Sequence, residues 1–182
     1  IPVSYQDTPN KLDQLQRFKG IIHLERLAEV IKDTSLCGLG QTAPNPAIFP
    51  SAGCCDLTVS YDNAADRWVL SFLGSGAQIA VSDGPNPLTS GWYVYTISAI
   101  QDYQKLSVWS DGYYITENTN GSNKVWALER AAMLNGDPNA GILGFNLPGI
   151  VTSGFFSPQV LNVTNNNLPA AGGATVVYMQ DD

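Results

Sequence analysis

The residues best suited to metal or redox chemistry in this sequence are its three cysteines, Cys37, Cys54 and Cys55. A [4Fe–4S] cluster normally takes four thiolates, one more than the sequence provides. Cys54 and Cys55 are adjacent, and in an extended segment adjacent side chains point to opposite faces, so such a pair rarely serves one metal. We therefore interpret Cys37 first as a free or disulfide-bonded thiol.

A catalytic dyad or triad would have to use His23, because it is the single histidine of the sequence. No nucleophile-elbow motif or oxyanion signal accompanies it. Its neighbours Ile22 and Leu24 belong to a helical pattern. We interpret His23 as a half-buried or surface side chain.

Carboxylates are the remaining groups that could do chemistry, as the acid and base of a glycoside hydrolase or as ligands of a hard cation. The sequence brings no two of them together, and most stand in predicted turns, where Asp is common for backbone reasons. The oxygen-rich loops Asp83-Gly84 and Asn118–Asn123 suit Ca²⁺, although no EF-hand spacing is present. The candidate acid–base residues are Asp56, Asp62, Asp66, Asp102, Asp111, Glu117 and Glu129.

Short β-strands must position these carboxylates. Aromatic and β-branched residues on both sides of Ser110-Asp111-Gly112 predict a hairpin of Lys105–Trp109 and Tyr113–Thr116. Similar segments recur every 8–14 residues or so, which is typical of a sandwich, barrel or propeller. A helix is expected over Glu129–Leu134, ended by Asn135-Gly136. The predicted strands are Leu57–Tyr61, Trp68–Leu73, Gln78–Val81, Trp92–Ile97, Leu106–Trp109, Tyr113–Thr116, Lys124–Leu128, Ile142–Phe145, Gln159–Val163 and Thr175–Met179.

The first fifty residues differ from the rest. They carry five basic and five acidic side chains, whereas residues 51–182 carry four and eleven and hold all four tryptophans. Apolar residues recur at helical spacing between Leu12 and Leu36, and a Gly/Pro-rich loop around Cys37 follows. We therefore predict a helical N-terminal segment, 1–50, and a β domain, 51–182. The apolar stripe of the helical segment needs a partner surface, and we expect it to dock on the β domain.

Composition excludes two kinds of partner. The net charge is −7 with a pI near 4.4, and the nine Lys and Arg residues are scattered, which argues against nucleic acid. No run of 18 apolar residues is present, so no membrane-spanning helix is expected.

The segment Leu27–Pro46 resembles the C-terminal iron–sulfur region of the flavoprotein, NADH-oxidising subunit of complex I and of related NAD-linked hydrogenases. The resemblance reaches over residues 12–48. It implies that Cys37 matches the fourth ligand of a [4Fe–4S] cluster. The other three ligands of that family come from an upstream Cys-x-x-Cys-x-x-Cys motif that this sequence does not contain.

Residues 51–182 resemble a group of secreted bacterial β-propeller proteins, frequent in Bacteroidetes, with Gln104 standing where the group usually has Pro. The resemblance implies a mainly β fold, an incomplete β-propeller-like array of short antiparallel strands preceded by the short α-helical segment. A propeller needs at least four blades of four strands, so ten strands leave exposed sheet edges for a partner chain to cover. The matching segments are Asp56–Ser71, Ile79–Ser82, Gly91–Tyr95, Asp102–Thr116 and Glu129–Leu134.

These observations favour a non-enzymatic exported module of the β-propeller type, acting at the cell surface or outside the cell on a glycan or protein. One alternative is a cytoplasmic electron-transfer fragment in which Cys37 ligates a [4Fe–4S] cluster completed by another chain. A second is a carbohydrate-active enzyme that uses acidic residues. The two resemblances point to different compartments, so a chimeric chain is a further interpretation.

Overall fold

The computed structural model describes residues 19, 48–49, 56–87, 89–119, 121–150, 156–163 and 165–180. Within these residues the chain is mainly β and the strand pairs are antiparallel, as the sequence predicts. Its strands form two four-stranded sheets and one two-stranded sheet. Apart from residue 19, the predicted helical segment between Leu12 and Leu36 lies outside the described residues. Cys37, Cys54, Cys55 and His23 lie outside them as well.

The first sheet is a meander in which each strand pairs with the next one along the chain. Its register aligns Val59, Leu70, Ala80 and Val94 in one row across the sheet. Since side chains alternate along each strand, Val69, Val81 and Tyr93 form a row on the opposite face. The strands are β1 (Thr58–Asp62), β2 (Arg67–Gly74), β3 (Gly76–Ser82) and β4 (Trp92–Ile97).

The second sheet repeats this meander, with a one-and-a-half-turn helix between its last two strands. The helix α2 (Arg130–Leu134) ends at Asn135 and Gly136, and Gly136 has a φ of +70°. A side chain at Gly136 would collide with the ring of Tyr93, so glycine is required there for two reasons. The strands are β5 (Lys105–Val108), β6 (Gly112–Thr116), β7 (Val125–Glu129) and β8 (Ile142–Phe145).

The third sheet consists of β9 (Phe156–Val160) and β10 (Val176–Gln180). Pro158 has no backbone N–H, but the two-stranded sheet tolerates it because β9 is an edge strand. The loop between the strands packs on the β5–β6 turn, where the Trp109 indole Nε1 donates to Gly172 O at 3.1 Å and the Ser110 hydroxyl to Ala170 O at 3.0 Å.

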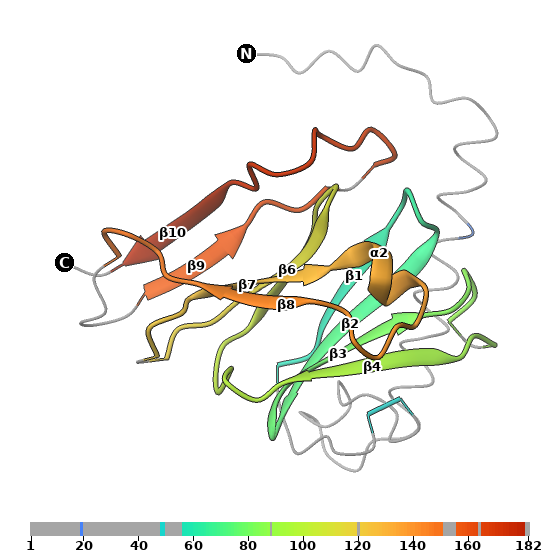
Figure 1. Ribbon diagram of the computed structural model, residues 1–182, viewed down its shortest axis with the longest axis horizontal. Helices are drawn as coiled ribbons and strands as arrows, with labels where there is room; N and C mark the ends of the chain where they lie inside the picture. The colour runs from blue at the N-terminus through green and yellow to red at the C-terminus, as the bar shows by residue number, and fades with distance from the viewer. Residues whose placement is uncertain are drawn as a thin grey trace.

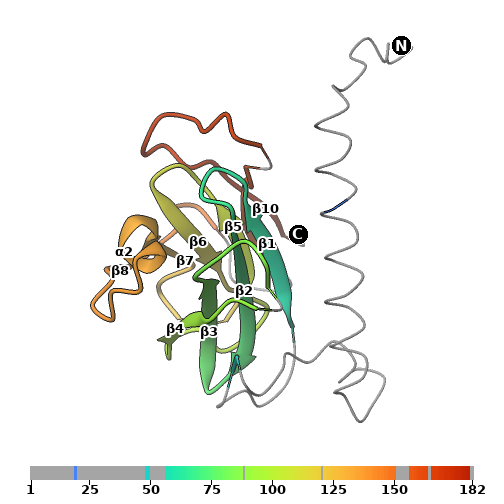
Figure 2. The same ribbon diagram turned by 90° about the vertical axis from the view of Figure 1, so that its right-hand side faces the viewer.

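The three sheets follow one another across the molecule in sequence order (Figure 1). The first strands of successive sheets are neighbours, β1 beside β5 and β5 beside β9. In the view turned by 90° the first two sheets are seen to face each other, with α2 at their outer side (Figure 2). The main core fills the space between these sheets, with Ile79 and Tyr95 from one side and Ile115, Trp126 and Met133 from the other.

The far face of the first sheet is covered by residues that precede β1. Phe49 is buried against Leu70, Phe72 and Ala80, with its ring centroid 5.9 Å from that of Phe72. Ile48 packs on the same cluster. The two described residues just before the predicted boundary at residue 50 therefore lie on the β domain; the boundary itself stays a prediction.

Candidate functional site

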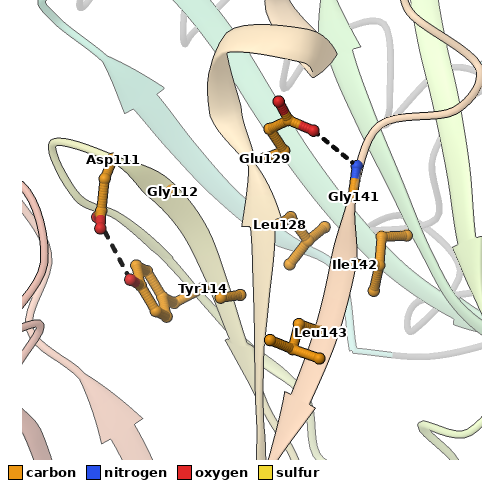
Figure 3. Close-up of a pocket in the computed structure, with 9 residues that line it drawn as sticks. Asp111, Gly112, Tyr114, Leu128, Glu129, Gly141, Ile142 and Leu143 are labelled. Carbon is orange, nitrogen blue, oxygen red and sulfur yellow. Dashed lines mark hydrogen bonds between the residues drawn. The ribbon is translucent and has the colours of Figure 1, made fainter.

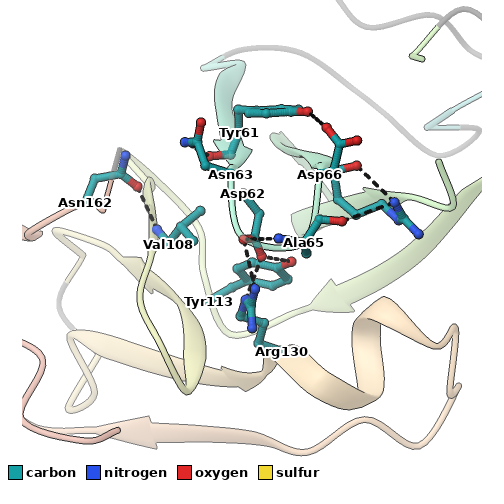
Figure 4. A network of polar contacts seen from close by, with 10 residues as sticks. Tyr61, Asp62, Asn63, Ala65, Asp66, Val108, Tyr113, Arg130 and Asn162 are labelled. Carbon is teal, nitrogen blue, oxygen red and sulfur yellow. Dashed lines mark hydrogen bonds and ion pairs between the residues drawn. The ribbon is translucent and has the colours of Figure 1, made fainter. Parts of the chain in front are cut away.

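The most strongly bonded carboxylate in the described part of the chain is Asp62, at the end of β1. Its Oδ2 accepts hydrogen bonds from the Tyr113 hydroxyl at 2.8 Å and from Arg130 Nε at 2.6 Å. Its Oδ1 accepts from Arg130 Nη2 at 2.9 Å and from the Ala65 amide at 3.1 Å. Figure 4 shows this arrangement, in which β1 of the first sheet meets β6 and α2 of the second. We call Asp62, Tyr113 and Arg130 the inter-sheet cluster.

Protonation states in the inter-sheet cluster follow from these contacts. Burial alone would raise the pKa of Asp62, but hydrogen bonds from Arg130 and Tyr113 outweigh it and hold the pKa below its ordinary value. The hydrogen bond to Asp62 raises the pKa of Arg130. Burial, followed by the charge of Asp62, raises the pKa of Tyr113 far above its ordinary value. The cluster is thus an ionised pair with a neutral phenol.

The inter-sheet cluster is built for packing rather than for catalysis. Asp62 is fully buried, and both of its oxygens already accept two hydrogen bonds. A general base needs a free lone pair within reach of its substrate. Asp62 therefore links the two sheets. A bidentate Arg–carboxylate pair suits this role because its two parallel hydrogen bonds fix the relative orientation of the two side chains.

A second buried pair lies in the β6–β7 connection. The Lys124 ammonium donates to Gly121 O at 2.5 Å and to Thr119 O, and it pairs with Glu117 Oε1 at 3.4 Å. The other oxygen of Glu117 accepts from the amide and the hydroxyl of Thr119. Lys124 thus supplies the positive charge for oxygens of the loop that the sequence assigns to Ca²⁺. That calcium site stays a prediction.

An accessible, shallow depression of about 350 Å³ lies on the second sheet. Its floor and walls come from β6, β7 and β8 and from the turn before β6 (Figure 3). Apolar side chains supply much of the lining, and Leu143 is 61% exposed. The lining residues are Asp111, Gly112, Tyr114, Ala127, Leu128, Glu129, Gly141, Ile142 and Leu143; we call this the β6–β8 depression.

Two carboxylates and a phenol supply the polarity of the β6–β8 depression. The Tyr114 hydroxyl donates to Asp111 Oδ1 at 3.3 Å, and Asp111 Oδ2 accepts from the Gly172 amide at 2.8 Å. Glu129 Oε2 accepts from the Gly141 amide at 3.0 Å. Burial and the neighbouring Asp111 raise the pKa of Tyr114, so the phenol stays neutral at physiological pH. Asp111 and Glu129 are both solvent-exposed.

The structure separates the other predicted acid–base residues. Glu117 is buried with Lys124, whereas Asp56, Asp66 and Asp102 are exposed and line no part of the β6–β8 depression. Of the seven candidates, Asp111 and Glu129 are therefore the pair that the structure brings to one depression.

The sequence did not identify the partner of Asp62. The Asp66-Arg67-Trp68 segment predicts that Arg67 lies on Trp68 or a neighbouring ring and pairs with Asp62 or Asp66. The structure corrects the pairing: Arg67 Nη1 donates to the backbone oxygens of Ala65 and Asp66, and Asp62 binds Arg130. One signal was present, because residues 51–182 hold only four basic side chains for the buried carboxylates to choose from.

Within the described ranges no group of three or more His, Cys, Asp or Glu side chains gathers where a metal ion could bind. Nor does any helix there have the length and apolarity to cross a bilayer.

Comparison with known proteins finds one short similarity. A stretch of 41 residues in the N-terminal part is 51% identical to the NADP-reducing hydrogenase subunit HndC of Solidesulfovibrio fructosivorans. The match covers 20% of this chain and 8% of that subunit, so the chain spans less than a tenth of its relative's length. No family model matches the sequence, and no solved structure is similar to it. The N-terminal resemblance to a hydrogenase subunit is thus confirmed over a short stretch. The assignment of that stretch to an iron–sulfur region and the propeller resemblance stay predictions.

Proposed function

We propose that the β domain is a non-catalytic binding module of the β-propeller type, which works at the cell surface or outside the cell and engages a protein partner at the β6–β8 depression. The propeller type is supported by the repeat of four-stranded meanders whose first strands are neighbours. The extracellular setting is supported by the resemblance of residues 51–182 to secreted proteins.

The observation that carries the proposal is the pairing of exposed apolar and anionic groups in one accessible place. Leu143 and Ile142 are exposed beside Tyr114, while Asp111 and Glu129 flank them. Exposed apolar patches with a polar rim are typical of protein-interaction sites. Two carboxylates and no cation in the lining favour a partner that presents Lys or Arg next to apolar side chains.

Peptide binding tests this function. The probes are fluorescein-labelled ten-residue peptides in which Lys or Arg alternates with Leu and Phe, with a matched set that carries Glu in place of the cations. We expect the cationic set to bind, and the double variant Asp111→Asn/Glu129→Gln to bind about tenfold more weakly, because two exposed charge contacts contribute roughly 0.2–1 kcal/mol each.

The matched control is Asp102→Asn, which removes an exposed carboxylate outside the depression and should leave binding unchanged. Equal binding of the cationic and Glu peptide sets, or an unchanged affinity in the double variant, would refute the proposed site. Incubation of the same variants with polysaccharides tests the carbohydrate-active alternative: hydrolysis that disappears in Glu129→Gln would replace the binding function by a catalytic one.

A second candidate function is electron transfer by the N-terminal segment. The similarity to a hydrogenase subunit favours it, and Cys37 is the residue that would ligate a [4Fe–4S] cluster completed by another chain. The test is iron and acid-labile sulfide on anaerobically purified protein, together with the visible spectrum. Near-stoichiometric iron that is lost in Cys37→Ser supports electron transfer, whereas a colourless, iron-free protein removes it.

A further inference from the structure

Two buried hydroxyl groups of the first sheet have no hydrogen-bond partner among the described residues. They belong to Thr58 of β1 and Ser71 of β2. The two residues are directly opposite each other in the β1–β2 register, so their side chains stand on the same face of the sheet, about 4.5–5.5 Å apart at Cβ. Such a pair is uncommon, because buried polar groups are nearly always hydrogen-bonded.

The hydroxyl pair faces the second sheet. The register continues the row of side chains from Ser71 to Ile79 of β3 and Tyr95 of β4. Ile79 and Tyr95 belong to the main core, which lies between the first and second sheets. Thr58 and Ser71 therefore direct their hydroxyl groups into the same interface.

A third unsatisfied oxygen comes from the other side of this interface. Gln104 directly precedes β5 and is fully buried, and its Oε1 has no partner among the described residues. Its Nε2 donates to Asp56 O at 2.5 Å, which fixes the orientation of the carboxamide, because a backbone oxygen only accepts. Asp56 is two residues before Thr58. The Gln104 carboxamide thus lies at the end of β1 where Thr58 and Ser71 pair.

The next interface, between the second and third sheets, satisfies its hydroxyl groups directly. The Ser107 hydroxyl of β5 donates to Val160 O at 2.6 Å, and the Thr116 hydroxyl of β6 donates to Pro158 O at 2.7 Å. Thr116 is the fifth residue of β6, and Ser71 is the fifth residue of β2. Ser71 thus has the position from which a hydroxyl reaches a backbone oxygen of the following sheet, but it makes no such bond.

We propose that one water molecule is bound between the first two sheets, held by Thr58 Oγ1, Ser71 Oγ and Gln104 Oε1. The two hydroxyls donate to the water oxygen, and the water donates one hydrogen to the amide oxygen. Three hydrogen bonds are typical of a buried water. A divalent cation fits less well, because it takes about six or more oxygen ligands with carboxylates among them, and these three oxygens are neutral. The water site is independent of the proposed binding function.

Oxygen-17 magnetic relaxation dispersion of water tests the inference on the full chain, because its amplitude is proportional to the number of long-lived buried waters. Thr58→Val/Ser71→Val replaces both hydroxyls by methyl groups and leaves the water one polar partner, fewer than the two or so that it needs. We expect the amplitude to fall by the contribution of one water, with circular dichroism unchanged.

The matched control is Thr116→Val, which removes a hydroxyl that is bonded directly to Pro158 O and should leave the amplitude unchanged. An equal amplitude in the double variant and the unmodified chain overturns the inference.

A crystal structure of the unmodified chain is a second measurement, which needs no variant. We expect a solvent peak within about 3.2 Å of both Ser71 Oγ and Gln104 Oε1. A direct hydrogen bond from the Ser71 hydroxyl to a protein group, with no solvent peak between the sheets at this place, overturns the inference. So does a peak surrounded by about six oxygens, which identifies a cation.

Discussion

Replacing Asp62 by Asn tests the role of the inter-sheet cluster. The amide has nearly the shape of the carboxylate, but it carries no charge and must direct its Nδ2 hydrogens at a group that is itself a donor. In the unmodified protein Arg130 Nε lies 2.6 Å from Asp62 Oδ2. In the variant the half-buried guanidinium has lost this counter-ion. Breaking a buried pair from one side costs about 3–5 kcal/mol, a large part of a typical domain's 5–15 kcal/mol or so.

A double-mutant cycle separates the ion pair from the rest of the environment. In Asp62→Asn/Arg130→Met both charges are gone, so no charge remains uncompensated. We expect the double variant to be at least about 2 kcal/mol more stable than the sum of the single variants predicts. Tyr113→Phe removes one hydrogen bond to the carboxylate and should cost about 1.5–3 kcal/mol, as for hydrogen bonds to charged groups.

Urea unfolding at pH 7, followed by tryptophan fluorescence, measures these differences, since Trp68 and Trp126 are buried and become exposed. With a slope of about 2 kcal/mol per molar urea, Asp62→Asn should lower the midpoint by about 2 M. The exposed Asp102→Asn is the control and should stay within about 0.5 kcal/mol of the unmodified chain. A midpoint of Asp62→Asn within error of that control, or additive effects in the cycle, would refute the reasoning.

Three further predictions rest on single contacts. The folded-state pKa of Asp62 lies below its unfolded value near 4, so its stabilisation is present above about pH 4 and is lost as pH falls through the folded pKa. Between pH 7 and 2 the urea midpoint should therefore fall less for Asp62→Asn than for the unmodified chain. Parallel curves for the two proteins would contradict this. Gly136→Ala should destabilise by more than about 1 kcal/mol, since Gly136 has φ +70° and faces the Tyr93 ring; thermal melting that is unchanged would show that the loop adapts. Lys124→Met should cost about 3–5 kcal/mol by leaving Glu117 buried without its cation, and urea stability equal to the unmodified chain would show that water replaces the ammonium.

Most of the β fold was predictable because its signals are local. The Asp111-Gly112 turn and the aromatic and β-branched residues beside it predicted the β5–β6 hairpin. The structure confirms it, with a shift of one residue at each of the two boundaries next to the turn. The short helix is also confirmed, beginning at Arg130 rather than Glu129. Meander sheets favour this kind of inference, since each strand pairs with its sequence neighbour and turn chemistry sets the register.

The candidate site was predictable only in part, because it depends on contacts between distant residues. Asp111 and Glu129 were named as acidic candidates, but their common place follows from the pairing of Gly112 with Glu129 across two strands. The Asp62–Arg130 contact joins residues 68 positions apart. Arg67, five residues from Asp62, was the nearer choice, yet its guanidinium points back to its own turn.

The successive meanders have a consequence for how the domain folds. Strand pairing within each sheet closes short loops, so each sheet can form early and at low entropic cost. Contacts between sheets, such as the Asp62–Arg130 pair, form only after two such units exist. The free energy of unfolding is then close to a sum over units and the interfaces between neighbours, as in repeat proteins. Among the described units, β9 with β10 has the fewest strands, so it should open first and exchange its amides fastest.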